Sequence, residues 1–134
     1  MTTTFVIDAS VAAKWVTDEK GTSEALRLRQ QAKLLAPDLL MAECANIFWK
    51  KVQRKELSQD EALFAARLLA SADVELLSTR PLCEPATCMS IELGHPAYDC
   101  LYLALAVEKD CPFVTADETF LRKLRQGGAE SISW

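Results

Sequence analysis

The sequence holds a single histidine, four glycines and five prolines, and it has no long run of apolar residues. So little glycine and proline argues against a fibrous or low-complexity chain. No segment approaches the roughly 20 apolar residues of a membrane-spanning helix, and the start, Met1–Thr4, lacks the basic segment that opens a secretory signal. We therefore expect one domain over residues 1–134, located in the cytoplasm and without contact to a membrane.

The residues that a nucleophilic or zinc-dependent enzyme needs are also scarce. The only histidine, His95, precedes Pro96 at a predicted helix start. A turn or capping role is expected for His95, because no GxSxG-type turn accompanies it to build a Ser-His-Asp triad. The cysteines are odd in number and lack a CxxC pair, so reduced thiols are expected rather than disulfides or a zinc site. They are Cys44, Cys83, Cys88, Cys100 and Cys111.

An excess of positive charge is missing too, because the formal net charge is −4 and gives no chain-wide sign of nucleic-acid binding. Two local basic clusters lie in predicted helices. They are Lys50, Lys51, Arg54 and Lys55 in one helix, and Arg122, Lys123 and Arg125 in the other. Cations are favoured near the C-terminal ends of helices, so a solvated helix face is the simplest interpretation. Contact with phosphate groups is the alternative.

What the sequence does contain is two apolar stretches that each run into an acid. Residues 5–7 are followed by Asp8, with a hydroxyl residue, Ser10, two positions later. Residues 113–114 are followed by Thr115 and then by Asp117. In open α/β sheets the ligand lies beyond the carboxyl ends of the strands, so both acids stand where a site is expected.

The remaining pattern alternates between short apolar stretches and amphipathic ones, which predicts an α/β fold with a parallel sheet and helices on its faces. Strands are predicted over residues 5–7, 33–36, 74–77, 113–115 and 131–133. Helices are predicted over about 10–16, 22–31, 37–55, 58–70, 81–93, 97–107 and 118–126. Ser10 is expected to cap the first helix, Ser58 and Glu61 form a capping box, and glycines 94, 127 and 128 are expected to end helices.

Two further acids lie close to predicted apolar surfaces. Glu43 borders the apolar stripe of the helix over 37–55, and Asn46 lies three residues later on the same face. Asp99 opens the helix over 97–107, which is apolar nearly all round and is therefore expected to be covered on both sides. Each acid also has an ordinary explanation, since Glu43 can reach solvent or a lysine and Asp99 can interact with the helix dipole.

Placed together at the carboxyl edge of a parallel sheet, the four acids Asp8, Glu43, Asp99 and Asp117 would form one acidic pocket. Two carboxylates about 4 Å apart repel by about 4 kcal/mol at an effective dielectric of about 20, so such a pocket favours protonation or a bound cation. Oxygen ligands without His or Cys are typical of Mg²⁺ or Mn²⁺ rather than zinc or copper. Because Mg²⁺ takes its remaining ligands from water and phosphate, an acidic protein could bind a polyanion.

With these residues assembled, the sequence resembles the PIN-domain ribonucleases, and among them the VapC toxins of VapBC toxin-antitoxin modules. Four motifs carry the resemblance, in the family's order and over nearly the whole chain. They are Val6-Ile7-Asp8-Ala9-Ser10, Glu43-Cys44-Ala45-Asn46, Tyr98-Asp99-Cys100-Leu101-Tyr102-Leu103-Ala104 and Val114-Thr115-Ala116-Asp117. The resemblance implies a three-layer α/β/α sandwich around a five-stranded, mainly parallel sheet. It also implies Mg²⁺-dependent endonucleolytic cleavage of RNA, by a metal-activated water.

The resemblance further implies a role for each residue of the site. The catalytic and metal-binding residues would be Asp8, Glu43, Asp99 and Asp117, and the residues that orient a carboxylate or touch substrate would be Ser10, Asn46 and Thr115. Glu118 stands beside Asp117 as an alternative acid. The family also implies a homodimer and a small antitoxin protein that covers the acidic groove. Trp15, Phe48 and Trp49 are candidate contacts for such partners, although aromatic residues are more often part of the core.

Three other interpretations compete with a nuclease. A phosphoacceptor receiver domain has a similar length and an acidic Mg²⁺ pocket, but it would need paired acids after the first strand and a lysine after the last. A phosphatase of the haloacid-dehalogenase type would carry a second Asp where Ser10 stands. A PIN fold could also act only as a module that binds RNA or a protein partner, without cleavage.

Overall fold

The sequence folds into five strands and seven α-helices, with two short 3₁₀ turns, in a computed structural model that describes residues 3–126 and 132–133. The strands are β1 (Thr3–Ile7), β2 (Ala32–Pro37), β3 (Glu75–Leu77), β4 (Phe113–Val114) and β5 (Ile132–Ser133). The helices are α1 (Ala9–Ala12), α2 (Thr22–Gln31), α3 (Leu39–Gln53), α4 (Gln59–Ala70), α5 (Cys83–Leu93), α6 (Ala97–Lys109) and α7 (Glu118–Gln126). The 3₁₀ turns are η1 (Ala13–Trp15) and η2 (Arg80–Leu82).

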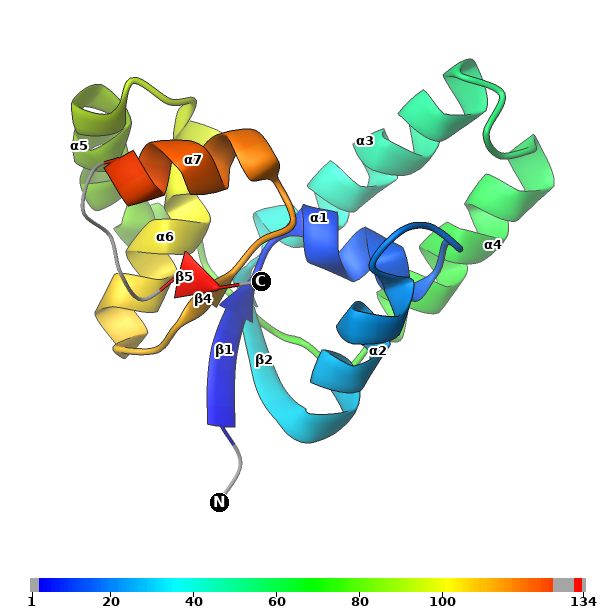
Figure 1. Cartoon of the computed structure of the whole chain (residues 1–134), viewed down its shortest axis with the longest axis horizontal. Coiled ribbons are helices and arrows are strands. Elements are labelled where there is room, and N and C mark those ends of the chain that lie inside the picture. Colours follow the sequence, from blue (N-terminus) through cyan, green and yellow to red (C-terminus); the bar gives the residue numbers. More distant parts are fainter. Residues whose placement is uncertain (1–2, 127–131, 134) are drawn as a thin grey trace.

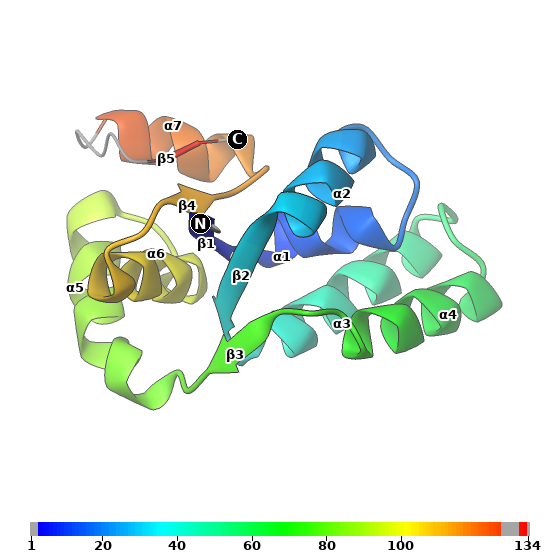
Figure 2. The ribbon, with the colours of Figure 1, turned by 90° about the horizontal axis from the view of Figure 1, so that it is seen from below.

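The strands form one sheet in the order β3-β2-β1-β4-β5, and each neighbouring pair is parallel. Helices α1 to α4 lie on one side of this sheet and α5 to α7 on the other (Figures 1 and 2). The predicted three-layer α/β/α sandwich with a five-stranded parallel sheet is therefore confirmed.

The strand order places a crevice at the carboxyl ends of β1 and β4. From the central strand β1 the chain moves to β2 on one side, and it later returns to β4 on the other, where Ile7 lies opposite Val114. In open α/β sheets, ligands bind where the direction of winding reverses in this way. The order also differs from the 2-1-3-4-5 order of receiver domains, which excludes that alternative.

Helix α6 lies between the sheet and α5, as its apolar sequence predicts. It contacts β1, β2 and β4 on one side and packs along α5 on the other. Its buried residues include Cys100, Tyr102 and Leu105, whereas Tyr98 and Val107 remain exposed. Burial of one large side chain contributes about 1.5–3 kcal/mol, so this helix holds its first turn, with Asp99, firmly against the sheet.

Several predicted boundaries differ from the structure, and two of these differences lie next to the crevice. The first helix begins at Ala9 rather than Ser10, because the Asp8 carboxylate caps it by accepting hydrogen bonds from the Ser10 and Val11 N–H groups. Pro37 belongs to strand β2, where it lies opposite Leu77, and not to the helix that follows. A proline is tolerated there because it is the last residue of the strand. It has no N–H group that would need a hydrogen-bond partner in the sheet.

The predicted capping box and the predicted helix end at Gly94 are confirmed. Ser58 Oγ accepts a hydrogen bond from the Glu61 N–H at 3.1 Å, and the Glu61 carboxylate accepts one from the Ser58 N–H at 2.8 Å, which completes the predicted capping box. Gly94 ends α5 in a left-handed conformation (φ 62°) that glycine adopts readily. Gly127, Gly128 and Ser131 lie outside the described residues.

All five cysteines are free thiols, as expected, with Cys44 and Cys100 buried. Burial raises the pKa of Cys44 to about 12 and that of Cys100 to about 11, so neither thiol is a reactive thiolate. In the part of the chain that the structure describes, none of the helices has the length and apolar character needed to cross a bilayer.

Candidate active site

Asp8 occupies the crevice between β1 and β4 and is enclosed by hydrogen-bond donors. The Ser10 hydroxyl donates to its Oδ1 at 2.5 Å, and the Ser10 and Val11 N–H groups reach the same oxygen at 3.0 and 3.3 Å. The Thr115 hydroxyl donates to Oδ2 from the end of β4. The carboxylate is therefore fixed in one orientation by donors from two neighbouring strand ends.

Burial of Asp8 disfavours the ionised form of its carboxyl group. The side chain is only 5% exposed. The pKa of Asp8 is raised from 3.8 to about 7, mainly by the removal of water and also by the charge of Asp99, against the lowering effect of hydrogen bonds from Ser10 and Thr115. The ionised form is thus costly without a compensating cation.

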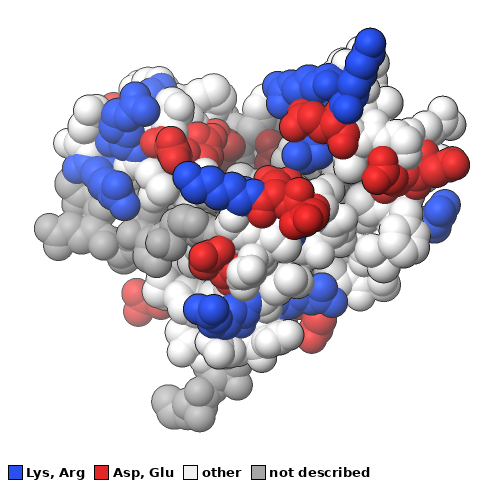
Figure 3. Space-filling model, turned by 45° about the vertical axis from the view of Figure 1, so that its right-hand side comes forward, with Lys and Arg blue, Asp and Glu red and all other residues white. Residues whose placement is uncertain are grey.

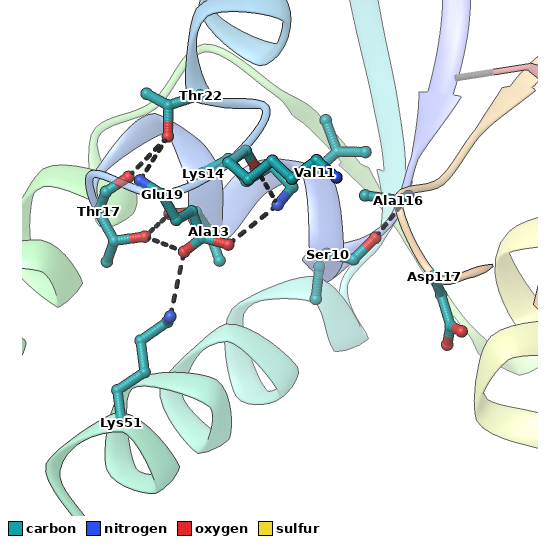
Figure 4. A network of polar contacts seen from close by, with 12 residues as sticks. Ser10, Val11, Ala13, Lys14, Thr17, Glu19, Thr22, Lys51, Ala116 and Asp117 are labelled. Atoms are coloured by element: carbon teal, nitrogen blue, oxygen red, sulfur yellow. Dashed lines mark hydrogen bonds and ion pairs between the residues drawn. The ribbon is translucent and has the colours of Figure 1, made fainter. Parts of the chain in front are cut away.

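The same two hydroxyls tie the loop after β4 to the first helix. The Ala116 N–H donates to Ser10 Oγ at 2.8 Å, and the Asp117 N–H donates to Thr115 Oγ1 at 3.1 Å. Figure 4 shows the Ser10 to Ala116 contact, with Asp117 on the neighbouring part of the loop. Ser10 and Thr115 therefore orient both the Asp8 carboxylate and the loop that carries Asp117.

Glu43 approaches the crevice from α3 and is held by α6. The Tyr102 hydroxyl donates to Glu43 Oε1 at 2.6 Å. Burial raises the pKa of Glu43, the hydrogen bond from Tyr102 opposes this, and the charge of Asp99 adds to it. Burial and the Glu43 carboxylate raise the pKa of Tyr102 as well, so that the phenol stays a donor.

Asp99 projects from the first turn of α6 and is paired with the only histidine. Asp99 Oδ2 lies 2.5 Å from His95 Nε2, and 27% of the Asp99 side chain is exposed. The imidazole ring stacks on Phe120 of α7 with ring centroids 4.4 Å apart. His95 thus braces a site carboxylate, a role that the sequence did not predict.

Asp117 has both a structural contact and a place at the site. Its Oδ1 accepts a hydrogen bond from the Phe120 N–H at 3.1 Å, which caps α7. Asp117 lines the same hollow as Asp8, whereas Glu118 lines a different hollow on the far side of the loop. Of the two candidate acids at this position, Asp117 is the one beside the crevice.

These side chains border one open pocket of about 480 Å³ at the carboxyl edge of the sheet. Its walls hold all four predicted acids: Asp8, Glu43, Asp99 and Asp117. Ser10 and Asn46 also line it, together with Lys50 from the basic end of α3. Thr115 is fully buried behind Asp8 and acts through that carboxylate.

The donor set suits a hard divalent cation with few direct protein ligands. Within residues 3–126 and 132–133, no three His, Cys, Asp or Glu side chains are arranged to hold one ion directly. Mg²⁺ in proteins usually takes one or two carboxylates and completes its shell with water and phosphate. Four carboxylates around a pocket fit that mode, and a direct role for each of them stays a prediction.

A half-buried ion network supports the wall of the site next to Ser10. Glu19 binds the ammonium groups of Lys14 at 3.0 Å and Lys51 at 3.1 Å, and it accepts a hydrogen bond from Thr17 (Figure 4). The Lys51 ammonium is therefore paired with Glu19 in the loop before α2, whereas Lys50 lines the acidic pocket. Figure 3 shows lysine and arginine side chains interleaved with acidic ones on one face of the molecule, with acidic side chains around a recess in its upper part.

The candidate partner-contacting aromatics separate into core and surface. Trp15 and Phe48 are buried, and the Trp15 indole N–H donates to the Ala25 carbonyl at 2.8 Å. Trp49 is 57% exposed on α3. Of these three residues, only Trp49 is available to a partner.

The sequence missed His95 and Tyr102 as residues of the site. The spacing of His95 and Asp99 is i to i+4, which places two side chains on one face if the helix is extended by a turn, so that a signal was available. Tyr102 lies 59 positions from Glu43, and nothing local indicates that the two meet.

The sequence matches the family model of the PIN domain over residues 5–125. It is 29% identical over 121 residues to Ribonuclease VapC3 of Pyrobaculum aerophilum, an alignment that covers 88% of this chain and 92% of the relative.

Several solved structures resemble the fold, and two of them are named here. VapC20 of Mycobacterium tuberculosis, described as a toxin that cleaves the sarcin-ricin loop, superposes with a TM-score of 0.66 at 16% identity, over 88% of this chain and 93% of that chain. VapBC2 of Rickettsia felis, solved with a DNA fragment from its promoter, gives a TM-score of 0.65 at 10% identity, over 97% of each chain. At such low identity these two likenesses concern the fold alone.

Proposed function

Because the chain belongs to the PIN domain family, we propose that it is an Mg²⁺-dependent endoribonuclease and the toxin of a VapBC-type toxin-antitoxin pair. One observation carries the proposal: the buried Asp8 carboxylate is held by Ser10 and Thr115 at the end of two adjacent strands and opens onto a pocket with three further acids. The similarity to a relative named as a ribonuclease supports RNA as the substrate.

Each acid has its own part in the proposed site. Asp8 and Asp99 are the residues that would hold the metal ion, since Asp8 is fixed in orientation and Asp99 is partly exposed beside it. Glu43 and Asp117 would act from the pocket walls, through water. Ser10 and Thr115 keep both Asp8 oxygens aimed, and Asn46 would contact substrate at the pocket mouth.

A divalent cation would complete the proposed site. When bound in the pocket, Mg²⁺ (or Mn²⁺) would neutralise charge on the phosphate, lower the pKa of a water and stabilise the leaving oxygen. In-line attack by water on the phosphodiester leaves a 5′-phosphate and a 3′-hydroxyl. The proposal holds for a site with one ion or with two.

The partners belong to the same proposal. A cognate antitoxin protein would cover the acidic pocket, as the family resemblance implies, and the similarity of the fold to VapBC2 of Rickettsia felis supports such a partner. We also expect a homodimer and a cytoplasmic location. The exposed Trp49 is the aromatic candidate for contact with a partner.

The decisive experiment follows cleavage of a mixed pool of structured RNAs by the purified, antitoxin-free protein. Cleavage is expected with Mg²⁺, and neither with EDTA nor for Asp99→Asn. Glu108→Gln provides a matched control, because it removes one acid from an exposed position of the same helix, outside the pocket. Equal cleavage by wild type and Asp99→Asn would show that a contaminating nuclease or another site is responsible.

A PIN fold that binds RNA without cleaving it is the second candidate. Folded protein that binds RNA tightly with Mg²⁺ but leaves it intact would establish this alternative and end the nuclease proposal.

A further inference from the structure

A second hollow, larger than the acidic pocket, adjoins it across the loop after β4. It measures about 850 Å³ and lies between α7 and the segment that joins η1 to α2. Its charged lining consists of Lys14, Lys20, Glu24, Glu118, Arg122 and Arg125. This basic hollow, defined by those residues, has no part in holding the four acids.

The loop after β4 borders both hollows. Ala116 lines the basic hollow, and the next residue, Asp117, lines the acidic pocket. Ser10, in the acidic pocket, accepts the hydrogen bond from the Ala116 N–H, and Lys14 stands one helical turn after Ser10. An RNA strand that crossed this loop at Ala116 would pass from the acidic pocket to the basic hollow.

The lysine and arginine side chains of the basic hollow differ in whether they already pair with a carboxylate. The Lys14 ammonium already has two partners in the fold, because it pairs with the Glu19 carboxylate and donates a hydrogen bond to the Lys20 carbonyl at 2.7 Å. Lys20, Arg122 and Arg125 are exposed, and no described carboxylate lies within ion-pair distance of them. These three side chains can meet an anion without breaking a contact of the fold.

The acids in the lining are explained by local structure. Glu24 and Glu118 both stand in the first turn of a helix, where the dipole favours a negative charge. Lys123, between the two arginines in sequence, turns away from the hollow and donates to the Gly94 carbonyl at 2.8 Å. The predicted cluster on α7 thus divides, with Arg122 and Arg125 presented together to the hollow.

From this geometry we infer that the basic hollow binds the phosphates of the RNA strand on one side of the scissile bond. This inference rests on the proposed function and gives that site a direction. A pocket lined by four acids repels a polyanion, so cations next to it are needed to hold the flanking phosphates. Guanidinium groups are suited to phosphate oxygens because they donate two parallel hydrogen bonds.

The test measures RNA affinity without cleavage. Asp99→Asn serves as the parent, in Mg²⁺, with a short fluorescent single-stranded RNA of mixed sequence as the probe. Lys20→Glu with Arg122→Glu on this parent should weaken binding at least about tenfold at low salt. The slope of log affinity against log salt should flatten by about 1.4, since one phosphate contact with a single strand contributes about 0.7.

A matched variant controls for net charge. Arg67→Glu with Arg80→Glu makes the same change in charge at exposed positions that do not line the hollow. This control should keep the parent's RNA affinity to within about twofold. Its slope of log affinity against log salt should equal that of the parent. Thermal unfolding of both variants checks that each is folded.

The possible results separate the hollow from the proposed function. Equal weakening in the two double variants, or no weakening in either, overturns the hollow as an RNA site, even if the wild type still cleaves RNA with metal and Asp99. Binding of an acidic polyglutamate peptide that depends on Lys20 and Arg122, with unchanged RNA affinity, overturns it as well and points to a protein partner. If the wild type neither cleaves nor binds RNA, the proposed function fails first.

Discussion

The acidic pocket and the basic hollow share one loop but are built in opposite ways. Asp8 is buried and held by donors from two strand ends, whereas Lys20, Arg122 and Arg125 are exposed on helix and loop surfaces. Chemistry requires fixed geometry, and the buried contacts of the pocket provide it. Attraction of a polyanion requires mainly charge, which flexible side chains can supply.

This contrast tells us what each kind of variant should do. Changes in the pocket should alter the reaction and the stability together, because its polar groups are also contacts of the fold. Changes in the hollow should alter affinity in a salt-dependent way and leave stability nearly unchanged. The predictions below test the contrast from the pocket outward.

The largest effect concerns the cost of burying the Asp8 charge. Folding raises the pKa of Asp8 from 3.8 to about 7, so the native state binds more protons than the unfolded state between these values. The free energy of unfolding should therefore fall as the pH rises through that window, by up to about 4 kcal/mol. Thermal unfolding in EDTA, from about pH 4 to about pH 8, measures this change.

Asp8→Asn is the matched variant for this prediction, because it keeps the shape and removes the titrating charge. Its stability should depend less on pH, and it should exceed wild-type stability near pH 8 in EDTA. Added Mg²⁺ should stabilise the wild type more than the variant. The same pH slope in both proteins would show that the Asp8 charge is not the cause.

An intermediate effect is expected from Thr115→Val, which removes the donor to Asp8 Oδ2 and the acceptor for the Asp117 N–H. Loss of a residue that orients a metal-binding carboxylate typically costs about 10- to 100-fold in activity or metal affinity. RNA cleavage at several Mg²⁺ concentrations measures both. Thr119→Val, at an exposed position on α7, is the control and should cleave like the wild type.

The smallest effect should come from the ion network at the border of the two hollows. Burial raises the pKa of Glu19, but hydrogen bonds from Thr17, Lys14 and Lys51 outweigh this and hold the pKa below its usual value. Glu19→Gln should therefore lower the free energy of unfolding at neutral pH by about 1 kcal/mol. Denaturant unfolding at low and high salt checks this, and an unchanged midpoint would mean that the network adds nothing to stability.

Much of this arrangement could be read from the sequence. Asp8 and Asp117 follow apolar strands, and parallel strands bring their carboxyl ends to one edge, so their proximity follows from local signals. The apolar α6 could be placed against the sheet for the same kind of reason. Glu43 and Asp99 stood out by their places beside apolar helix surfaces, and the family resemblance then implied the roles of Ser10 and Thr115.

The rest depended on contacts between distant parts of the chain. The pair of Tyr102 with Glu43 could not be predicted, because helix positions alone do not tell which residues of two helices meet. Asp8 was missed as a cap because Ser10 is an equally good capping residue by type. The two arginines of the basic hollow lie three residues apart, so helical spacing could have separated them from Lys123.

The most direct test of the acidic pocket as a hydrolytic site is the fate of the oxygen that attacks phosphorus. RNA is cleaved by the wild type with Mg²⁺ in water labelled with heavy oxygen, and the product ends are read by mass spectrometry. We predict heavy oxygen in a 5′-phosphate, opposite an unlabelled 3′-hydroxyl. Unlabelled 2′,3′-cyclic phosphate ends would show attack by the RNA's own 2′-hydroxyl, and would contradict a pocket that hydrolyses RNA with water.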